Sequence, residues 1–382
     1  MYDRWVQAAS LGKISGVILL DLSSAFDLVD HDCLRKKLQI YGILSDSLQW
    51  IDSYLKHRRQ AVWIDNVLSE FLDCEIGVPQ GSNLGPLFFL IYFNDLLHTV
   101  ECSIDSYADD TTLTSSGNST QEIEEKLKID CDSISTWMKS NLLKLNPEKT
   151  HLLTTGTTKR LSQVLSPLTV QMDNVALKED PSQSECLLGV IIESTLKWNK
   201  QLSALKVKLA QRLYGLNQVK FICPFNVRKI VAEGSFNSVL AYCLPLFGGL
   251  EKYQIQELQV LQNKAARIVC RAAPRSNRLA LFSKLKWFTV NQLICYYTLV
   301  AVFKVRKSRS PEYLADILCK DSRNGRIQIP NIQLTLAYKS FCFRGAQQYN
   351  LLPSEIRFQD KIGAFKKLVK RWIADHVPAF LE

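Results

Sequence analysis

The chain has 382 residues, of which 47% are hydrophobic and 22% are charged, a composition that is typical of a globular protein. Its 16 glycines and 12 prolines are too few for a fibrous or wholly disordered chain. The 11 cysteines are odd in number and include no C-x-x-C pair, which predicts free thiols in a reducing compartment, the nucleus or the cytoplasm, and not secretion. The longest apolar runs, 86–93 and 293–303, are shorter than the roughly 18–20 residues of a membrane span, so no membrane partner is predicted.

Charge is divided unevenly along the chain. Residues 1–158 carry 13 Lys and Arg against 22 Asp and Glu, whereas residues 159–382 carry 34 against 15. A strongly basic second half predicts a nucleic-acid partner for that half. A basic surface that is merely solvated is the alternative.

The first half of the chain alternates strand and helix patterns. A buried strand is predicted at 16–21, and helices are predicted at 32–41 and from Ser45. Further elements are predicted in the order strands at 60–65 and 70–76, a helix after Pro86, a hairpin at 104–114, a helix at 122–140 and a strand at 149–155. Strands with helices packed on one face indicate an α+β fold. From residue 196 the pattern becomes mainly helical, which predicts two domains, 1–195 and 196–382.

Three carboxylates stand at positions where chemistry is expected. Asp21 ends the apolar run, and Asp109 and Asp110 lie at the hairpin turn. A carboxylate at the end of a buried strand is costly unless it is paired or liganded, and three together raise one another's pKa unless a cation lies among them. Purely oxygen ligands favour Mg²⁺ or Mn²⁺. For the Asp109–Asp110 pair alone, a turn cap is the commoner interpretation.

Five blocks appear in a fixed order along the chain. They are LDLSSAFDLVDH at 20–31, GVPQGSNLGP at 77–86, YADD at 107–110, LNPEKT at 145–150 and CLLGVI at 186–191. In this order they resemble the reverse transcriptases of non-LTR (LINE-type) retrotransposons, most closely those of the jockey and CR1 kind. LQNKAARIVC at 261–270 and LKWFTV at 285–290 also resemble the C-terminal region of these elements.

The resemblance implies a fold and an activity. The fold would be a right-hand polymerase palm, an antiparallel sheet with packed helices and remnant fingers, over residues 1–195. A helical, basic thumb and C-terminal region would follow over 196–382. The activity would be RNA-directed DNA polymerase, in which deoxynucleoside triphosphates are added to the 3′-hydroxyl of a DNA primer along an RNA template. The sequence does not indicate an oligomeric state.

The resemblance also assigns roles to residues. Asp21, Asp109 and Asp110 would bind two Mg²⁺ (or Mn²⁺) ions, and Lys149 would lie near the pyrophosphate as a proton donor. The nucleotide would be bound by Leu22 and the backbone that follows it to Ala25, and by Phe26, Gln80 and Gly81. Phe26 matches the family's steric gate, which would exclude a ribose 2′-hydroxyl. The alternatives are a core aromatic for Phe26 and a solvated lysine for Lys149.

Two further sets of residues have simpler interpretations. Asp27, Asp30 and His31 are interpreted as caps of the helix that starts there. Lys264, Arg267 and Arg271 are spaced three and four apart, which predicts one helix face that contacts phosphates. The runs at 200–212 and 366–371 are alternative phosphate-binding faces, and a solvated face is the alternative for each single residue.

The segment before the first block is short. Only 20 residues precede Asp21, and Arg4 and Lys13 are the basic ones among them. We therefore expect the family's fingers to be largely missing, as in an N-terminally truncated fragment. Two alternatives stay open: an inactive remnant with the palm fold, and a non-catalytic nucleic-acid-binding protein.

Overall fold

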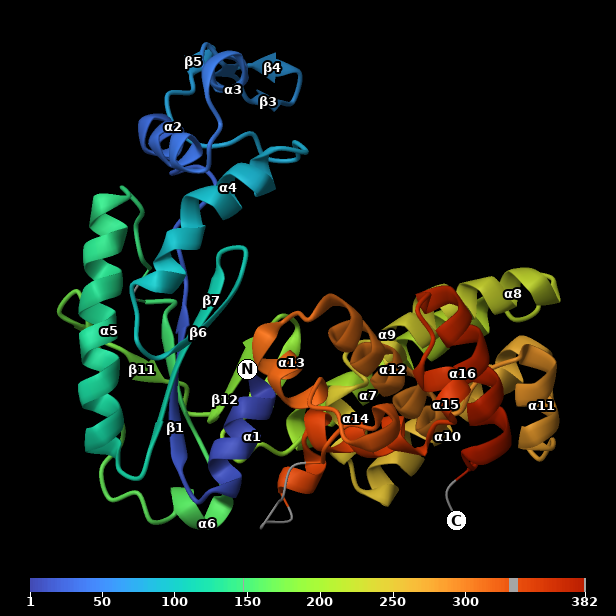
Figure 1. The fold of residues 1–382 in the computed structure, drawn as a ribbon. Helices are drawn as coiled ribbons and strands as arrows, with labels where there is room; N and C mark the ends of the chain where they lie inside the picture. The colour runs from blue at the N-terminus through green and yellow to red at the C-terminus, as the bar shows by residue number, and fades with distance from the viewer. Residues whose placement is uncertain (147, 330–335, 381–382) are drawn as a thin grey trace. The chain divides into compact units, whose positions relative to one another are not determined.

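The computed structural model describes residues 1–146, 148–329 and 336–380. The chain divides into two compact units (Figure 1). The first comprises Gly12–Leu188 together with Met1, and the second comprises Gly189–Glu382 together with Tyr2–Leu11. The boundary therefore lies at residues 188 and 189 rather than at the predicted 195 and 196, and the N-terminal helix belongs to the second unit.

A mixed sheet forms the centre of the first unit. Its strands lie in the order β11-β8-β1-β7-β6. Their bounds are β1 (Ile14–Leu20), β6 (Ser103–Tyr107), β7 (Asp110–Gly117), β8 (His151–Thr155) and β11 (Lys178–Glu179). The central strand β1 is antiparallel to both β7 and β8, while β11 pairs with β8 in parallel. Because β1 has a neighbour on each side, its apolar run is buried, and Val17 and Ile18 are completely inaccessible to solvent.

One long helix, α5 (Thr120–Ser140), covers a face of this sheet (Figure 1). The hydroxyl of Ser119 accepts a hydrogen bond from the amide of Glu122 and caps the helix. Gly16 of β1 allows close approach, since a Cβ there would lie 2.7 Å from a methyl group of Ile123. The predicted helical stripe at residues 122–140 is therefore confirmed as the face that packs on the sheet.

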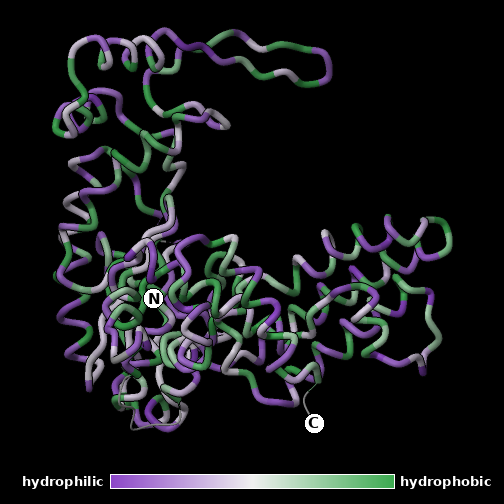
Figure 2. Tube along the Cα trace, turned by 45° about the vertical axis from the view of Figure 1, so that its right-hand side comes forward, coloured by the Kyte–Doolittle hydropathy of each residue, from purple (hydrophilic) through white to green (hydrophobic). Residues whose placement is uncertain are grey.

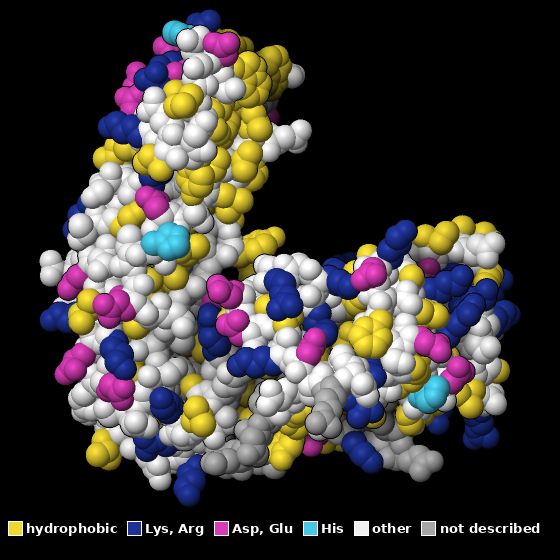
Figure 3. Space-filling model, viewed as in Figure 1, with side chains coloured by type: hydrophobic (Ala, Val, Ile, Leu, Met, Phe, Trp, Pro, Cys, Tyr) yellow, Lys and Arg dark blue, Asp and Glu magenta, His cyan; other side chains and the backbone are white. Residues whose placement is uncertain are grey.

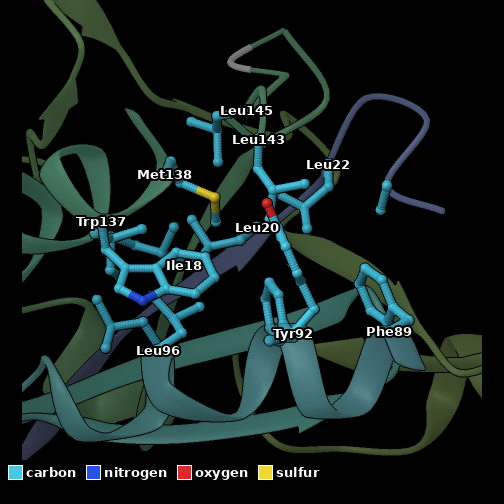
Figure 4. Close-up of a cluster of buried hydrophobic side chains, with 14 of the residues drawn as sticks. Ile18, Leu20, Leu22, Phe89, Tyr92, Leu96, Trp137, Met138, Leu143 and Leu145 are labelled. Atoms are coloured by element: carbon cyan, nitrogen blue, oxygen red, sulfur yellow. The ribbon is translucent and has the colours of Figure 1, made fainter. Parts of the chain in front are cut away.

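The core beneath this face combines side chains from several blocks (Figure 4). Ile18, Leu20 and Leu22 pack against aromatic residues of α4 (Gly85–Phe93) and against residues of and after α5. Those partners include Phe89, Tyr92, Trp137, Met138, Leu143 and Leu145. The hydroxyl of Tyr92 donates a 2.5 Å hydrogen bond to the carbonyl of Asn141. The core thus joins the helix after the second block to the segment that carries the first.

The region between the first two blocks contains two helices, α2 (His31–Ile40) and α3 (Ser45–Leu55), and a long hairpin. The strands predicted at 60–65 and 70–76 are broken into two short antiparallel pairs. The pairs are β2 (Arg59–Gln60) with β5 (Leu72–Asp73), and β3 (Trp63–Ile64) with β4 (Val67–Leu68). Between the two pairs, the amide of Ser69 donates to the carbonyl of Val62, while the amide of Val62 donates to the hydroxyl of Ser69 instead of to a backbone carbonyl. Trp63, Ile64 and Phe71 remain exposed on this hairpin. The hairpin extends from the rest of the trace in Figure 2, and hydrophobic side chains gather on the same part of the surface in Figure 3.

Short elements lie between residues 158 and 187 of the first unit. They are α6 (Thr158–Leu161), β9 (Gln171–Met172), β10 (Val175–Ala176) and β12 (Ser184–Leu187). β9 and β10 pair as a hairpin, and its Met172 contributes to the core beneath α5.

The second unit is mainly helical, as the sequence predicts. Its elements are α1 (Tyr2–Ser10), β13 (Val190–Glu193), α7 (Asn199–Gln218), α8 (Phe225–Ala232), α9 (Ser238–Ala241), α10 (Lys252–Cys270), α11 (Arg278–Leu285), α12 (Val290–Ser308), α13 (Glu312–Leu318), α14 (Phe341–Leu351), α15 (Ser354–Arg357) and α16 (Ile362–His376). The N-terminal helix is held here because the buried carboxylate of Asp3 accepts hydrogen bonds from the amides of Phe341 and Cys342, both 2.7 Å long.

Helix α12 is the core helix of this unit. Its Phe303 stacks on Phe365 of α16, with the ring centroids 4.1 Å apart. By length and hydropathy alone the stretch Arg278–Ser308 passes the criteria for a membrane span, but 61% of its apolar window is buried inside the protein. The apolar side chains of α12 therefore have a packing role within this unit.

Candidate active site

The three predicted carboxylates lie at one edge of the sheet. Leu20, the last residue of β1, pairs with Thr111 of β7, so Asp21 and Asp110 are the next residues along two adjacent antiparallel strands. Asp109 lies in the two-residue turn that joins β6 to β7, because Tyr107 pairs directly with Asp110. The turn places Ala108 at φ +54°, a conformation that is uncommon for any residue other than glycine.

The fourth block is tied to the same edge. The amide of Asn146 donates to the carbonyl of Asp21 over 2.9 Å, and the amide of Ser23 donates to the carbonyl of Lys144 over 2.9 Å. Thr150 also accepts a hydrogen bond from the Asp21 amide through its hydroxyl. The backbone on both sides of Asp21 is therefore fixed by Lys144, Asn146 and Thr150.

Lys149 lies in a turn rather than in the strand predicted at 149–155. The amides of Lys149 and Thr150 both bond back to the carbonyl of Asn146, which delays the start of β8 to His151. The side chain of Lys149 is exposed, two residues before the strand that pairs with β1.

Electrostatic repulsion acts within the acidic edge. The pKa of Asp110 is raised by partial burial first, and then by the negative charges of Asp109 and Asp21. The charges of all three carboxylates are therefore close enough to interact. Within residues 1–146, 148–329 and 336–380, no group of three or more His, Cys, Asp and Glu residues is arranged so that it could hold a metal ion, so metal binding by Asp21, Asp109 and Asp110 stays a prediction.

The first and second blocks are joined by backbone hydrogen bonds. The amide of Val78 donates to the carbonyl of Phe26 over 2.9 Å, and the amide of Gly77 donates to the carbonyl of Val29 over 2.7 Å. Gln80 then donates through Nε2 to Oδ1 of Asp27, 2.8 Å away. Gln80 is thus held beside the segment that carries Phe26.

The contacts of Phe26 agree in part with a core aromatic and leave part of the ring free for the predicted steric gate. Its ring stacks on Phe89 of α4 with a centroid distance of 4.5 Å and an interplanar angle of 24°. The side chain remains half-buried and packs against the edge of the core. One ring face therefore belongs to the core, and this contact fixes the orientation of the ring.

The capping interpretation holds for Asp30 but not for its neighbours. Asp30 accepts from the amide of Cys33 and caps α2. His31 instead bonds through Nε2 to the carbonyl of Gly77 over 2.7 Å, and Asp27 binds Gln80. Gly77 has φ +85°, and a Cβ there would lie 2.8 Å from the carbonyl oxygen of Asp27. The sequence spacing gave no sign of these contacts, because they join residues about 50 positions apart.

A polar pocket beside the second block contains residues that the sequence analysis missed. It has a volume of about 690 Å³ and is lined on one side by Asp27 and Gln80, and on the other by Arg58, Arg59 and Gln60. Arg58 lies over the ring of Tyr54, and Arg59 over that of Phe71. The signal in the sequence is the basic run KHRR at 56–59, which lies after Asp21 and so outside the segment where basic finger residues were sought.

Comparison with known proteins decides the family. Residues 4–213 match the family described as "Reverse transcriptase (RNA-dependent DNA polymerase)". The chain belongs to the reverse transcriptase family. This reverse transcriptase domain has relatives in *Drosophila* mobile elements, as the resemblance of its five blocks predicted.

Two curated relatives show the extent of the similarity. The probable RNA-directed DNA polymerase from transposon BS of *Drosophila melanogaster* is 29% identical over 310 residues, which cover 77% of this chain and 33% of the relative. The RNA-directed DNA polymerase from mobile element jockey of the same species is 24% identical over 269 residues, or 65% and 27% of the two chains. This reverse transcriptase chain thus spans about a third of the length of these relatives.

Two solved structures were also matched. Telomerase from *Candida albicans*, in complex with a fragment of telomeric RNA, gives a TM-score of 0.33 at 14% identity over 81% of this chain and 50% of its own. Telomerase from *Candida tropicalis*, with the same kind of RNA fragment, gives 0.39 at 14% identity over 98% and 52%.

The basic residues predicted to bind nucleic acid are placed differently from one another in this reverse transcriptase. Lys264 is exposed on α10, and Arg267 is half-buried, with its Nε atom buried and unpaired. Arg271 lies past the helix end at φ +52°, and its guanidinium donates to the carbonyls of Lys220, Phe221 and Cys223. It does not continue the helix face that its spacing predicts, because the helix ends at Cys270. Phosphate contacts by the three residues stay a prediction.

Proposed function

We propose that this chain is the catalytic part of an RNA-directed DNA polymerase, which adds deoxynucleotides to a DNA primer along an RNA template. The observation that carries the proposal is the pairing of Leu20 with Thr111. This register brings Asp21, from the first block, next to Asp110, from the third. Asp21, Asp109 and Asp110 repel one another, and bound cations would offset this repulsion.

The chemistry of this donor set fits two hard divalent cations. Asp21, Asp109 and Asp110 offer carboxylate oxygens alone, the ligands that Mg²⁺ and Mn²⁺ favour. Bound there, such ions supply the charge stabilisation of an in-line phosphoryl transfer and lower the pKa of the attacking hydroxyl. Hydrogen bonds with Lys144, Asn146 and Thr150 hold the backbone at Asp21, and the carboxylate side chains would turn toward a bound ion from this fixed backbone.

The neighbouring block supports a nucleotide site. The backbone of Leu22–Ala25 would lie along the triphosphate, and Gly81, with no neighbouring atom within 4 Å of a Cβ, would leave room for the template and the incoming base. Phe26 would exclude a ribose 2′-hydroxyl with the ring that Phe89 holds in place. Lys149 would donate a proton to the leaving pyrophosphate.

Arg58 and Arg59 offer the basic charge that the segment before Asp21 lacks. They face the same pocket as Gln80, so they would neutralise phosphates of the nucleotide or the template. The inactive-remnant alternative is therefore less favoured, because it depended on the shortage of basic residues that could bind the phosphates of the nucleotide.

In the terms of polymerase architecture, the first unit would act as a palm with partial fingers and the second as a thumb and C-terminal region. Residues 189–382 carry 31 Lys and Arg against 11 Asp and Glu. Such a balance suits sequence-independent contacts to the phosphates of a template–primer duplex. Work on these substrates would take place inside the cell, in the nucleus or the cytoplasm.

Primer extension tests this proposal. The 382-residue chain is incubated with an RNA template, a DNA primer and deoxynucleotides, with Mg²⁺, with Mn²⁺ and with a chelator. We expect extension only with a metal, and its loss in Asp109→Asn but not in Asp132→Asn, a matched change at an exposed position of α5. Duplex binding without extension would instead favour a nucleic-acid-binding protein, and equal extension by Asp109→Asn would exclude the assigned site.

A further inference from the structure

The two C-terminal blocks meet at a pocket whose residues have no part in the proposed polymerase site. Gln262, from the block at 261–270, donates through Nε2 to the carbonyl of Phe288, from the block at 285–290, over 2.9 Å. Gln259 binds the amide of Val290 over 2.9 Å through Oε1. These buried amide side chains hold the loop between α11 and α12 against α10, and the loop forms one wall of the pocket.

The pocket has a volume of about 710 Å³ and lies wholly within the second unit. Its walls are aromatic: Trp287 and Phe288 come from the loop, and Tyr296 and Tyr297 from α12. Trp287 is fixed by a 2.9 Å hydrogen bond from its Nε1 to Glu233. Rigid aromatic faces that are already oriented are suited to stacking on a planar ligand.

Cations surround these aromatic walls. Lys286 comes from the loop, and Lys370 and Arg371 come from α16. All three are exposed, and Lys370 lies 5.5 Å from the centroid of the Tyr296 ring. Across the parts of the chain that the structure describes, none of the three forms an ion pair with a carboxylate. Their charge is available to an anionic ligand.

A polar group inside the pocket lacks a partner. Asn237 lines the pocket at the end of a π-helical turn, η2 (Glu233–Asn237), and its Oδ1 atom is buried without a hydrogen-bond donor. Buried acceptors are rarely left unpaired, and π-helical turns are frequent at functional sites. An exocyclic amine or ring N–H of a nucleobase would supply the missing donor.

We propose that this pocket binds an unpaired nucleotide of a single-stranded RNA, with the base stacked among Phe288, Tyr296 and Tyr297 and the flanking phosphates held by Lys286, Lys370 and Arg371. Charge complementarity favours a nucleic acid over an apolar peptide, because the pocket combines aromatic walls with three unpaired cations. The ligand class rests on the proposed function, but the binding step requires no polymerisation.

Fluorescence anisotropy with a labelled, unstructured RNA 12-mer tests the pocket, with the full chain in a chelator and without deoxynucleotides. Loss of primer extension therefore does not affect the result. Stacking on one aromatic side chain contributes about a five- to hundredfold change in affinity, so Tyr297→Leu should weaken binding by that factor. Tyr253→Leu, at an exposed tyrosine outside the pocket, is the matched control and should bind like the wild type.

The cations are tested with a second pair on one helix. Lys370→Gln should weaken binding and lower the salt slope by about one unit, whereas Lys367→Gln, outside the pocket, should change it less. An RNA duplex presents no free base, so Tyr297→Leu should bind it unchanged, which also shows that the variant is folded. Equal single-strand affinity of Tyr297→Leu and Tyr253→Leu would overturn the proposal and leave the pocket to a ligand such as an apolar peptide.

Photo-crosslinking locates the contact independently. An RNA that carries 5-iodouridine should crosslink to a peptide that contains residues 286–297. Crosslinks confined to other segments of the chain would contradict the assignment.

Discussion

The acidic edge of the first unit and the aromatic pocket of the second differ in the sign and the spacing of their charges. At the edge, Asp21, Asp109 and Asp110 are brought together by strand register, and their repulsion contributes to the raised pKa of Asp110. Around the pocket, three cations lie on separate elements, α16 and the loop before α12. The first arrangement concentrates negative charge at one point and suits metal ions. The second spreads positive charge around apolar rings and suits a polyanion with planar bases.

This difference predicts that chemistry and affinity can be separated by mutation. If the carboxylates bind metal ions, replacing one of them should remove an interaction that acts in the transition state. Replacing cations on the second unit should instead remove phosphate contacts that are the same before and after the reaction.

Asp21→Asn should have the largest effect. Loss of a charged metal ligand should lower the rate of primer extension about a thousandfold, with affinity for the template–primer duplex changed less than about twofold, since the side chain makes no phosphate contact of its own. Single-turnover extension and anisotropy measure the two quantities. A parallel loss of affinity would break the separation.

Gly77→Ala should be the most damaging change to the fold of the first unit. The new Cβ would lie 2.8 Å from the carbonyl oxygen of Asp27 at φ +85°, so we expect a loss of about 2–4 kcal/mol in the free energy of unfolding. Gly42→Ala, at φ +84° in open space, is the control and should lose about 1 kcal/mol. Denaturant unfolding compares the two. Equal losses would show that the backbone of the first two blocks can shift to make room for the new Cβ at residue 77.

Phe26→Ala should relax the choice of sugar. Removing the ring should lower discrimination against ribonucleotides about ten- to hundredfold, because the 2′-hydroxyl is excluded sterically. The ratio of kcat/KM for a ribonucleotide and its deoxynucleotide measures this. Phe89→Leu, which removes the stacking partner but leaves Phe26, should have a smaller effect. Unchanged discrimination in Phe26→Ala would reduce Phe26 to a core residue.

The basic residues of α10 should divide between binding and stability. Replacing Lys264 and Arg267 by Gln should weaken duplex binding for any sequence and lower the salt slope by about two units. Arg271→Gln should instead lower the stability of the second unit, since its guanidinium bonds three backbone carbonyls. An unchanged slope in the double variant would move the search for the duplex contacts to 200–212 or 366–371.

Asp110→Asn should cause the smallest change in stability, and this change should be an increase. With a chelator at pH 7 it should raise the melting temperature by about 1–3 °C, because it removes a repelled charge. The folded-state pKa of Asp110 lies above its ordinary value, so ionisation is costly in the folded state. That cost is present above the raised pKa and disappears as the pH falls through it. The gain should therefore fade in acid, and a gain independent of pH would contradict the repulsion.

Local patterns were enough to predict that the three carboxylates lie at one edge of the sheet. The apolar run before Asp21 and the alternation around residues 104–114 each specify a strand by short-range periodicity, and a hairpin turn fixes the place of Asp109. Once the two strands pair, the three carboxylates share an edge. The register itself was not readable from the sequence, because it depends on how the sheet is assembled.

Contacts between distant residues were not predictable in this way. The docking of α1 depends on Asp3 and the amides of α14, which are 338 and 339 positions apart, and no pattern near residue 3 points to them. The hydrogen bond between Gln80 and Asp27 likewise joins two separate blocks, and neither block by itself indicates a partner in the other. Arg58 and Arg59 were overlooked for another reason: basic residues were sought before Asp21, whereas the fold places these two beside Gln80 from a later hairpin.

The central claim is that Asp21, Asp109 and Asp110 form one metal site. Replacing Mg²⁺ by Fe²⁺ in the presence of ascorbate and peroxide produces hydroxyl radicals at the bound ion, which cut the backbone nearby. We predict cleavage at two places, around residue 21 and around residues 109–110, that excess Mg²⁺ suppresses and that Asp21→Asn removes at both places together. Cleavage at only one of them, or at both in Asp21→Asn, would contradict a shared site.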